Sequence, residues 1–309
     1  MLKSHSIGVD IGGSHITCAA IHMQEGLLLE GTLARAEYHH EAPAEEIFHS
    51  WAKALNQTLA HISPDQLAGI GFAIPGPFDY ARGISEMKHK FPKLFGRHIP
   101  TELMPLLNTS RPLQMRFLND ASTFAVGEAW LGEGKTFQRV VAITLGTGFG
   151  SAFTRDGAPV VSGPTVPPEG CLWHLPFKDS IADDYFSTKW FVKKYAALSG
   201  ETISGVRDLI ERTDQDPLVK ELFATFGHNL AECLSTPLRQ FQAEVLIIGG
   251  NISHALPFFR IALEEGLIQQ DVQVSVRRSS LMEQAALLGS ARLLDDAFWQ
   301  KVSAELPEI

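Results

Sequence analysis

A chain of 309 residues, 45% hydrophobic and 20% charged, can bury a sizeable core and is too long for one compact unit, so we expect two lobes. A formal net charge of −9, without any cluster of five or more Lys and Arg, excludes nucleic acid as a partner. No apolar run reaches the roughly 18 residues that a membrane-spanning helix needs, and residues 1–6 are too polar for a signal peptide, which predicts a cytoplasmic protein without membrane contact.

The first part of the chain has the pattern of a hairpin-rich sheet. Residues 6–10, 16–21 and 27–29 have the composition of strands, and Gly-containing turns separate them. Apolar residues four apart then predict an amphipathic helix over residues 42–62. The short apolar run at residues 68–73 predicts a buried strand.

The same order of elements returns about 135 residues later, which indicates an internal duplication. Residues 140–145, 151–154 and 160–161 repeat the strand, Gly turn, strand, turn, strand pattern. Apolar residues four apart predict a second long helix that includes residues 218–230, and residues 245–248 predict another buried strand. The class is therefore α/β, with mixed sheets.

Two glycine turns occupy equivalent places in the two halves. The first, Asp-Ile-Gly-Gly-Ser at residues 10–14, follows a strand that delivers a carboxylate to glycines whose backbone N–H groups can approach phosphate. The second, Gly-Thr-Gly at residues 146–148, adds a hydroxyl donor. Each turn alone also fits a tight hairpin that binds nothing, but the pair predicts that both halves bind one polyanion. The predicted phosphate-binding residues are Asp10, Gly12, Gly13, Ser14, Gly146, Thr147 and Gly148.

A third motif follows the strand at residues 245–248. The chain there continues into Gly249, Gly250 and Asn251, where backbone without side chains can lie against a base or ribose, although an ordinary turn into a helix is the alternative. The glycine spacing does not fit the dinucleotide fingerprint, and no phosphate loop ends in Gly-Lys-Ser or Gly-Lys-Thr. Nicotinamide enzymes and P-loop nucleotidases are therefore disfavoured.

A carboxylate suited to catalysis stands in the fourth motif. A short apolar strand ends in Asn119 and Asp120, and a helix of small residues follows at 121–130. Phosphoryl transfer to an alcohol needs a carboxylate that accepts the hydroxyl proton, together with donors or metal ions for the developing charge. Asp120 fits the general base, and an Asn-Asp helix cap is the alternative interpretation.

Together these motifs resemble the ROK family of sugar kinases (repressors, open reading frames, kinases), in the actin-like, hexokinase-related ATPase superfamily. The resemblance extends along nearly the whole chain and includes Gly-Phe-Ala-Ile-Pro-Gly-Pro at residues 71–77 and a late helix at 285–291. It implies a duplicated actin-like ATPase (ribonuclease H-like) fold with two lobes around a cleft. The lobes would span residues 1–120 and 121–290, and a C-terminal helix in residues 291–309 would pack back on the first.

The resemblance also implies an activity. This is the ATP-dependent phosphorylation of a hexose, most simply glucose at its 6-hydroxyl, with Asp120 as general base and Asp10 holding Mg²⁺ through water. The run at residues 146–152 is similar to that of glucokinases, some of which accept polyphosphate. Fructose, N-acetylmannosamine or allose as acceptor, polyphosphate as donor, and a non-catalytic sugar sensor are the alternatives. Since pairing of subunits is usual in the family, we expect a homodimer.

Family members hold the sugar hydroxyls with the Asn-Asp pair, a Glu and a His in a Gly-Glu-x-Gly-His stretch, and a later acid. The matching residues here are Asn119, Asp120, Glu169, His174 and Asp183. Glu169 precedes His174 by five residues instead of the family's three, and Asp183 is one methylene shorter than the usual Glu.

The zinc motif typical of the family is missing. Residues 178–182 stand where the family has its Cys-rich loop. The three cysteines, Cys18, Cys171 and Cys233, are odd in number and far apart. This predicts reduced thiols, with neither a disulfide nor a structural zinc site.

Overall fold

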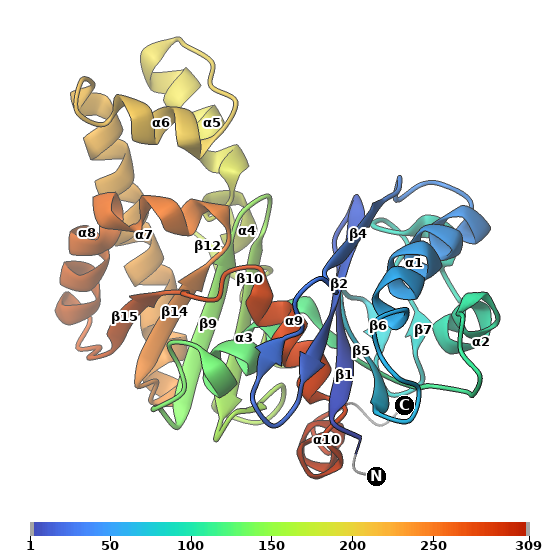
Figure 1. Ribbon diagram of the computed structural model, residues 1–309. Helices are drawn as coiled ribbons and strands as arrows, with labels where there is room; N and C mark the ends of the chain where they lie inside the picture. Colours follow the sequence, from blue (N-terminus) through green and yellow to red (C-terminus); the bar gives the residue numbers. More distant parts are fainter. Residues whose placement is uncertain (1–2, 307–309) are drawn as a thin grey trace. The chain divides into compact units, whose positions relative to one another are not determined.

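The computed structural model describes residues 3–306, which form two compact units (Figure 1). Unit 1 comprises the described residues up to Leu131 and those from Glu283 onward, and unit 2 comprises residues 132–282. Among the described residues, none of the helices combines the length and the apolar character needed to cross a bilayer.

Unit 1 contains one main sheet with helices on its faces. Its strands are β1 (His5–Ile11), β2 (His15–His22), β3 (Leu27–Leu28), β4 (Ala34–Glu37), β5 (Leu67–Ile74), β6 (Phe78–Asp79), β7 (Ile84–Ser85) and β8 (Gln114–Asn119). Its helices are α1 (Ala44–Leu59), α2 (Ile99–Leu103), α3 (Asp120–Leu131), α9 (Gln284–Arg292) and α10 (Asp296–Ser303), with the 3-10 turns η1 (Pro92–Leu94) and η2 (Met104–Leu106).

Unit 2 is built in the same way. Its strands are β9 (Arg139–Leu145), β10 (Phe149–Arg155), β11 (Ala158–Pro159), β12 (Pro176–Phe177), β13 (Ser180–Ile181), β14 (Val245–Gly249) and β15 (Ser275–Arg278). Its helices are α4 (Ala182–Tyr185), α5 (Thr188–Ser199), α6 (Val206–Arg212), α7 (Pro217–Phe241) and α8 (Leu256–Gln269), with the 3-10 turns η3 (Pro168–Gly170) and η4 (Asn251–Ala255).

The two main sheets share one topology. The strand order is β3-β2-β1-β5-β8 in unit 1, where β4 also pairs with β2, and β11-β10-β9-β14-β15 in unit 2. In each sheet, three antiparallel strands that are consecutive in the chain continue into two parallel strands. Each strand of this path in one sheet therefore has a counterpart in the other, which confirms the predicted duplication and the α/β class.

Alternation of side chains along β1 determines what covers each face of the unit 1 sheet. Val9 belongs to the buried apolar cluster on the face covered by α1, which contributes Trp51. Gly8 points to the opposite face, where α9 lies so close that a Cβ atom on Gly8 would be 1.9 Å from the carbonyl oxygen of Leu287. Because strand side chains alternate with period two, Asp10 shares the α9 face with Gly8.

Helix α9 packs closely against the other elements of unit 1 because glycines line the surface that it contacts. A Cβ atom on Gly71 of β5 would be 1.8 Å from the Ser290 carbonyl oxygen, and one on Gly127 of α3 would be 2.0 Å from the Ala285 carbonyl oxygen. These close backbone contacts explain why unit 1 takes in all of α3 and α9. The compact units accordingly divide after residue 131 and before residue 283. The lobes of residues 1–120 and 121–290 that the resemblance implies stay a prediction.

We expect Gly289→Ala to lower the free energy of unfolding by about 3 kcal/mol, because overpacked side chains in a tight core typically cost this much. The new Cβ atom would be 1.8 Å from the carbonyl oxygen of Thr123, and backbone cannot move aside as a side chain can. Urea titration measures the loss. Gly31→Ala is the control: nothing lies within 4 Å of its Cβ position, but its φ of +76° is unfavourable for alanine, so about 1 kcal/mol should be lost. Equal losses at both positions would contradict this packing account.

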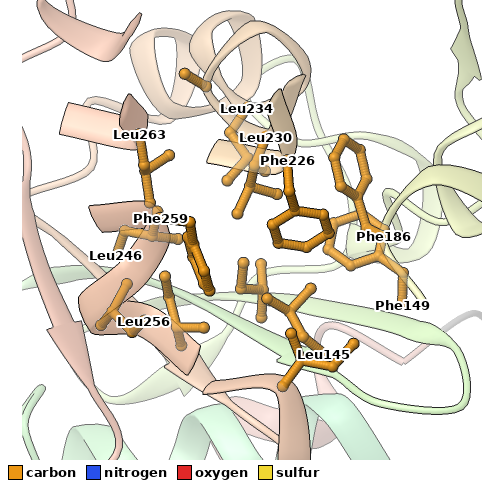
Figure 2. Close-up of a cluster of buried hydrophobic side chains, with 14 of the residues drawn as sticks. Leu145, Phe149, Phe186, Phe226, Leu230, Leu234, Leu246, Leu256, Phe259 and Leu263 are labelled. Atoms are coloured by element: carbon orange, nitrogen blue, oxygen red, sulfur yellow. The ribbon is translucent and has the colours of Figure 1, made fainter. Parts of the chain in front are cut away.

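The core of unit 2 lies between its sheet and the long helices α7 and α8 (Figure 2). Phe226 of α7 and Phe259 of α8 meet edge to face, with ring centroids 5.1 Å apart. Leu145 and Phe149 extend this core to the end of the β9–β10 hairpin, and both are fully or almost fully buried. The glycine turn between them is therefore anchored on both sides by apolar packing.

Candidate active site

Predicted site residues of unit 1 lie where its strands end. Asp10, near the end of β1, is paired with Ala73 of β5, and Ile74 is paired with Asn119 at the end of β8. These three strands are parallel, so their carboxyl ends meet at one edge of the sheet, which is where α/β folds bind ligands. Asp120 follows directly as the first residue of α3. The fold thus brings two predicted carboxylates and the predicted amide to the same edge.

Asn119 caps α3 and leaves Asp120 available. The Oδ1 atom of Asn119 accepts hydrogen bonds from the backbone N–H groups of Ala121 at 3.0 Å and Ser122 at 3.3 Å. Asp120 accepts the Ala121 N–H with its Oδ1 at 2.9 Å. Within residues 3–306 the Asp120 Oδ2 has no hydrogen-bond partner, and the side chain is half-buried. The capping role that the sequence left open for the pair thus falls mainly to Asn119, and Asp120 keeps an oxygen that can accept a proton.

Tyr80, which the sequence motifs missed, holds the amide of Asn119. Asn119 Nδ2 donates to the Tyr80 hydroxyl at 3.3 Å, and that hydroxyl donates to the Ile74 carbonyl oxygen at 3.4 Å. The Tyr80 ring packs against Phe78, with centroids 5.3 Å apart. No sequence signal marks Tyr80, because it lies in a turn after a short strand and meets Asn119 only in the folded chain.

The carboxyl group of Asp10 lies where negative charge is disfavoured. Burial, together with the negative charges of Asp120 and Glu283, raises the pKa of Asp10 to about 7. Glu283, immediately before α9, is a second residue that the motifs missed, since an acid before a helix ordinarily indicates only a favourable helix start. Two neighbouring carboxylates thus act on the carboxyl group of Asp10.

This charge distribution fits the Mg²⁺ that the family resemblance implies. Mg²⁺ is usually held by one or two carboxylates and completes its octahedral shell with water and substrate phosphates. Within residues 3–306, no three His, Cys, Asp or Glu side chains are arranged to hold a metal by themselves. Asp10 with the nearby acids is accordingly suited to a cation that arrives with phosphate.

The first glycine turn joins β1 to β2 and is braced from below. Gly12 N–H donates to the His15 carbonyl oxygen at 2.9 Å. The hydroxyl of Tyr38, just after β4, donates to the Gly12 carbonyl oxygen at 2.5 Å and lies 3.1 Å from that of His15; burial raises the pKa of this phenol above its ordinary value. Gly13 and Ser14 are exposed, and nothing lies within 4 Å of a Cβ atom on Gly13. The turn therefore exposes its backbone at Gly13 and Ser14, while hydrogen bonds hold its start at Gly12.

The second glycine turn joins β9 to β10 and is held on both sides. The backbone N–H and the hydroxyl of Thr188, at the start of α5, donate to the Gly146 carbonyl oxygen at 2.8 and 2.9 Å. Asp183 Oδ1 accepts the Phe149 N–H at 2.7 Å and would be 3.0 Å from a Cβ atom on Gly148. Asp183 therefore supports this turn, and its predicted contact with a sugar stays a prediction.

The predicted base-binding residues lie beside that turn. Parallel pairing of β14 with β9 brings Gly249 opposite Thr144. Gly250 has a φ of +75°, and a Cβ atom there would be 2.4 Å from the carbonyl oxygen of Leu145, so only glycine fits. Asn251 is exposed at the start of η4. Both glycine motifs of unit 2 thus lie at the same edge of its sheet.

Glu169 and His174 lie in the segment between β11 and β12. Glu169 is exposed within η3 and has a φ of +58°. His174 is half-buried, and its ring meets that of the exposed Trp173 edge to face at 5.3 Å. Within the described residues no hydrogen bond or ion pair joins Glu169 to His174, and their part in sugar binding stays a prediction.

Comparison with known proteins connects this geometry to a family. The ROK family profile matches residues 6–297. The glucokinase of Thermotoga maritima is 25% identical over 331 residues, an alignment that covers 96% of this chain and 99% of that protein.

Two solved structures share the fold. A ROK family glucokinase from Streptomyces griseus, in complex with glucose and AMPPNP, has a TM-score of 0.73 at 21% identity and covers 94% of this chain and 98% of its own. A ROK family transcriptional regulator, a homologue of the E. coli MLC protein, has a TM-score of 0.78 at 18% identity and covers 97% and 80%. The duplicated actin-like fold predicted from the sequence is therefore confirmed, and the profile match over nearly the whole chain shows that the protein belongs to the ROK family.

Proposed function

We propose that the chain is a sugar kinase that transfers the terminal phosphoryl group of ATP to a hexose, with the 6-hydroxyl of glucose as the first candidate acceptor. The observation that carries the proposal is the Asp120 carboxylate at the end of β8, with one oxygen unpartnered within the described residues and next to an amide that Tyr80 holds in place. The Thermotoga maritima glucokinase, aligned over nearly its whole length, supports the same reaction class.

In this reaction Asp120 is the general base. Its Oδ2 accepts the proton of the sugar hydroxyl as the hydroxyl oxygen bonds to the terminal phosphorus, and the bond from that phosphorus to the bridging oxygen of the nucleotide breaks. The proton then leaves Asp120 for solvent. Asn119 positions the sugar next to this carboxylate. Glu169, His174 and Asp183 are the further predicted sugar contacts.

The glycine turns bind the donor. The backbone N–H groups of Gly13, Ser14, Thr147 and Gly148 are suited to phosphate oxygens, because they have no acceptor among the described residues. Those of Gly12 and Gly146 donate to carbonyl oxygens at their own turns and keep the turns in shape. Residues 249–251 would lie against the base or ribose. Asp10, with Glu283 nearby, would hold Mg²⁺, which when bound offsets charge on the phosphates.

The two tyrosines give a paired prediction about the substrates. Tyr80→Phe removes the hydroxyl that holds Asn119, so the KM for the hexose should rise roughly three- to tenfold, with kcat nearly unchanged. Tyr38→Phe removes the brace under Gly12, so the KM for ATP should rise instead. Steady-state kinetics with each substrate varied in turn measures both. If both variants change the same KM, the assignment of Asn119 to the sugar and of the first glycine turn to the donor is contradicted.

A coupled assay for ADP over a panel of sugars tests the proposal. Glucose, fructose, allose and N-acetylmannosamine serve as acceptors. In parallel reactions polyphosphate replaces ATP, and the sugar phosphate is measured there because no ADP is formed. The similarity to a ROK family transcriptional regulator favours a second candidate, a sugar sensor without catalysis. A sensor predicts sugar binding by calorimetry with no sugar-dependent ADP, whereas a kinase predicts ADP formation with at least one sugar.

A cytoplasmic location and a homodimer complete the proposal, and both rest on the family resemblance. Sedimentation of the purified chain tests the dimer: a mass near 68 kDa, twice the 33.9 kDa of one chain, is expected. A single species at the monomer mass over the range of concentrations used in the kinetic assays would overturn it.

A further inference from the structure

An open cavity of about 340 Å³ lies in unit 2 next to the second glycine turn. Its lining residues are Thr147, Thr188, Lys189, Val192, Lys193 and Ser204. The volume falls within the range of small-molecule sites. All of these residues belong to unit 2, and α5, labelled in Figure 1, contributes four of them.

Two lysines give the cavity its charge. Lys189 and Lys193 lie four residues apart on α5, so their side chains share one face of the helix. Both are exposed, and within residues 3–306 neither forms an ion pair. Like charges at this spacing destabilise a helix. Two positive charges without an acidic partner among the described residues thus line one cavity, in a chain whose formal net charge is −9.

The rest of the lining is suited to phosphate oxygens. Thr147 is exposed at the tip of the glycine turn, and the backbone N–H groups of Thr147 and Gly148 have no hydrogen-bond acceptor among the described residues. The start of α5 lies next to the same turn, because the Thr188 N–H donates to the Gly146 carbonyl oxygen. The positive end of the helix dipole therefore also lies near the cavity. The nearby acid Asp208 is engaged by the N–H and hydroxyl of Ser204 and pairs with neither lysine.

We propose that Lys189 and Lys193 bind the phosphate chain of the phosphoryl donor, a phosphoanhydride polyanion, in this cavity. The inference rests on the proposed kinase function and adds two donor-binding residues to the glycine turns. A nucleoside triphosphate and an inorganic polyphosphate share this chemistry. Val192, half-buried and apolar, lines the same cavity and favours a donor that also carries a base.

Equilibrium binding without sugar tests the lysine pair. The probes are Mg²⁺-ATP, inorganic tripolyphosphate and adenosine, titrated into the full chain at low and moderate salt. Each lysine-to-alanine change should weaken ATP binding roughly tenfold, and the double variant should show the larger loss together with a weaker salt dependence. The double Lys→Arg variant, which keeps both charges, should bind within a few-fold of the wild type. Adenosine binding should not change.

Lys194→Ala is the matched control, because Lys194 is exposed on the same helix but does not line the cavity. Its charge instead helps to lower the pKa of Asp179. Its ATP affinity should equal that of the wild type. Loss of tripolyphosphate binding together with ATP binding in the double alanine variant identifies the phosphate chain as the shared ligand. Wild-type binding of ATP but not of tripolyphosphate identifies a nucleotide as the source.

Double-alanine affinity within twofold of the wild type for both polyanions, or a wild type that binds neither, would overturn the proposal. The outcome is independent of catalysis. Lysine-dependent ATP binding without turnover of any sugar would retain the lysine site and reject the kinase. Sugar turnover with an unchanged KM for the donor in the double alanine variant would retain the kinase and reject the lysine site.

Discussion

Asp120→Asn should lower kcat by a factor of about 10²–10⁴, the usual contribution of a positioned general base. The amide has nearly the shape of the carboxylate but cannot accept the proton of the sugar hydroxyl. The fold should be retained, because Asn119 supplies most of the cap of α3 and the new side chain still offers an oxygen to the Ala121 N–H. Steady-state kinetics and urea unfolding, run on the same preparations, measure both quantities.

Asp65→Asn is the control for this experiment, since Asp65 is an exposed carboxylate of unit 1 and the chemical change is identical. It should leave kcat and stability unchanged. An Asp120→Asn enzyme that keeps more than about a tenth of the wild-type kcat would remove Asp120 from the role of base. A large loss of stability in that variant would instead indicate that the carboxylate serves the helix end.

Asp10→Asn should have opposite effects on stability and on activity. Burial and two neighbouring acids raise the pKa of Asp10 in the folded protein to about 7, from an ordinary value of 3.8. Between these values the folded chain binds more protons than the unfolded chain at this group, so its contribution to the free energy of unfolding falls as the pH rises from about 4 to about 7. Above pH 7 the full penalty is present, on the order of a few kcal/mol.

The variant removes that penalty. At pH 8 its free energy of unfolding, measured by urea titration, should therefore exceed that of the wild type by up to a few kcal/mol, and at pH 4 the two free energies should be equal. Activity should be lost at both low and high Mg²⁺, because the amide replaces a carboxylate proposed to hold the ion. Fluorescence of the five tryptophans, of which Trp51 is fully buried in unit 1, reports unfolding of the chain. A variant less stable than the wild type at pH 8 would contradict the electrostatic account, as would a difference that does not change with pH.

The fold was predictable wherever apolar periodicity was strong. The predicted helix at residues 42–62 is α1, and the predicted strands at 68–73 and 245–248 are β5 and β14. The missed elements carry weaker signals: β4, with the sequence Ala-Arg-Ala-Glu, has no β-branched or aromatic residue, and α2 is only five residues long and contains a proline. Pairing with β2 stabilises β4, and this is a long-range contact that local composition does not reveal.

In the candidate site, the strand-end residues have a sequence signal, and the residues that support them do not. Asp10 and Asp120 each stand where a buried strand ends, a position readable from one sequence. Tyr80, Tyr38 and Glu283 act through partners distant in the chain, and their spacing gives no signal.

Lys189 and Lys193 were equally invisible in the sequence. Exposed lysines on a helix ordinarily indicate a solvated face, and only the cavity next to the glycine turn distinguishes these two.

Transfer of a labelled phosphoryl group tests the central claim most directly. The chain is incubated with ATP labelled at its terminal phosphorus and with the best sugar of the panel, and the products are separated. The account predicts label in a sugar 6-phosphate for the wild type and only background label there for Asp120→Asn. Label that appears in inorganic phosphate alone, or in the sugar to the same extent with both proteins, would contradict it.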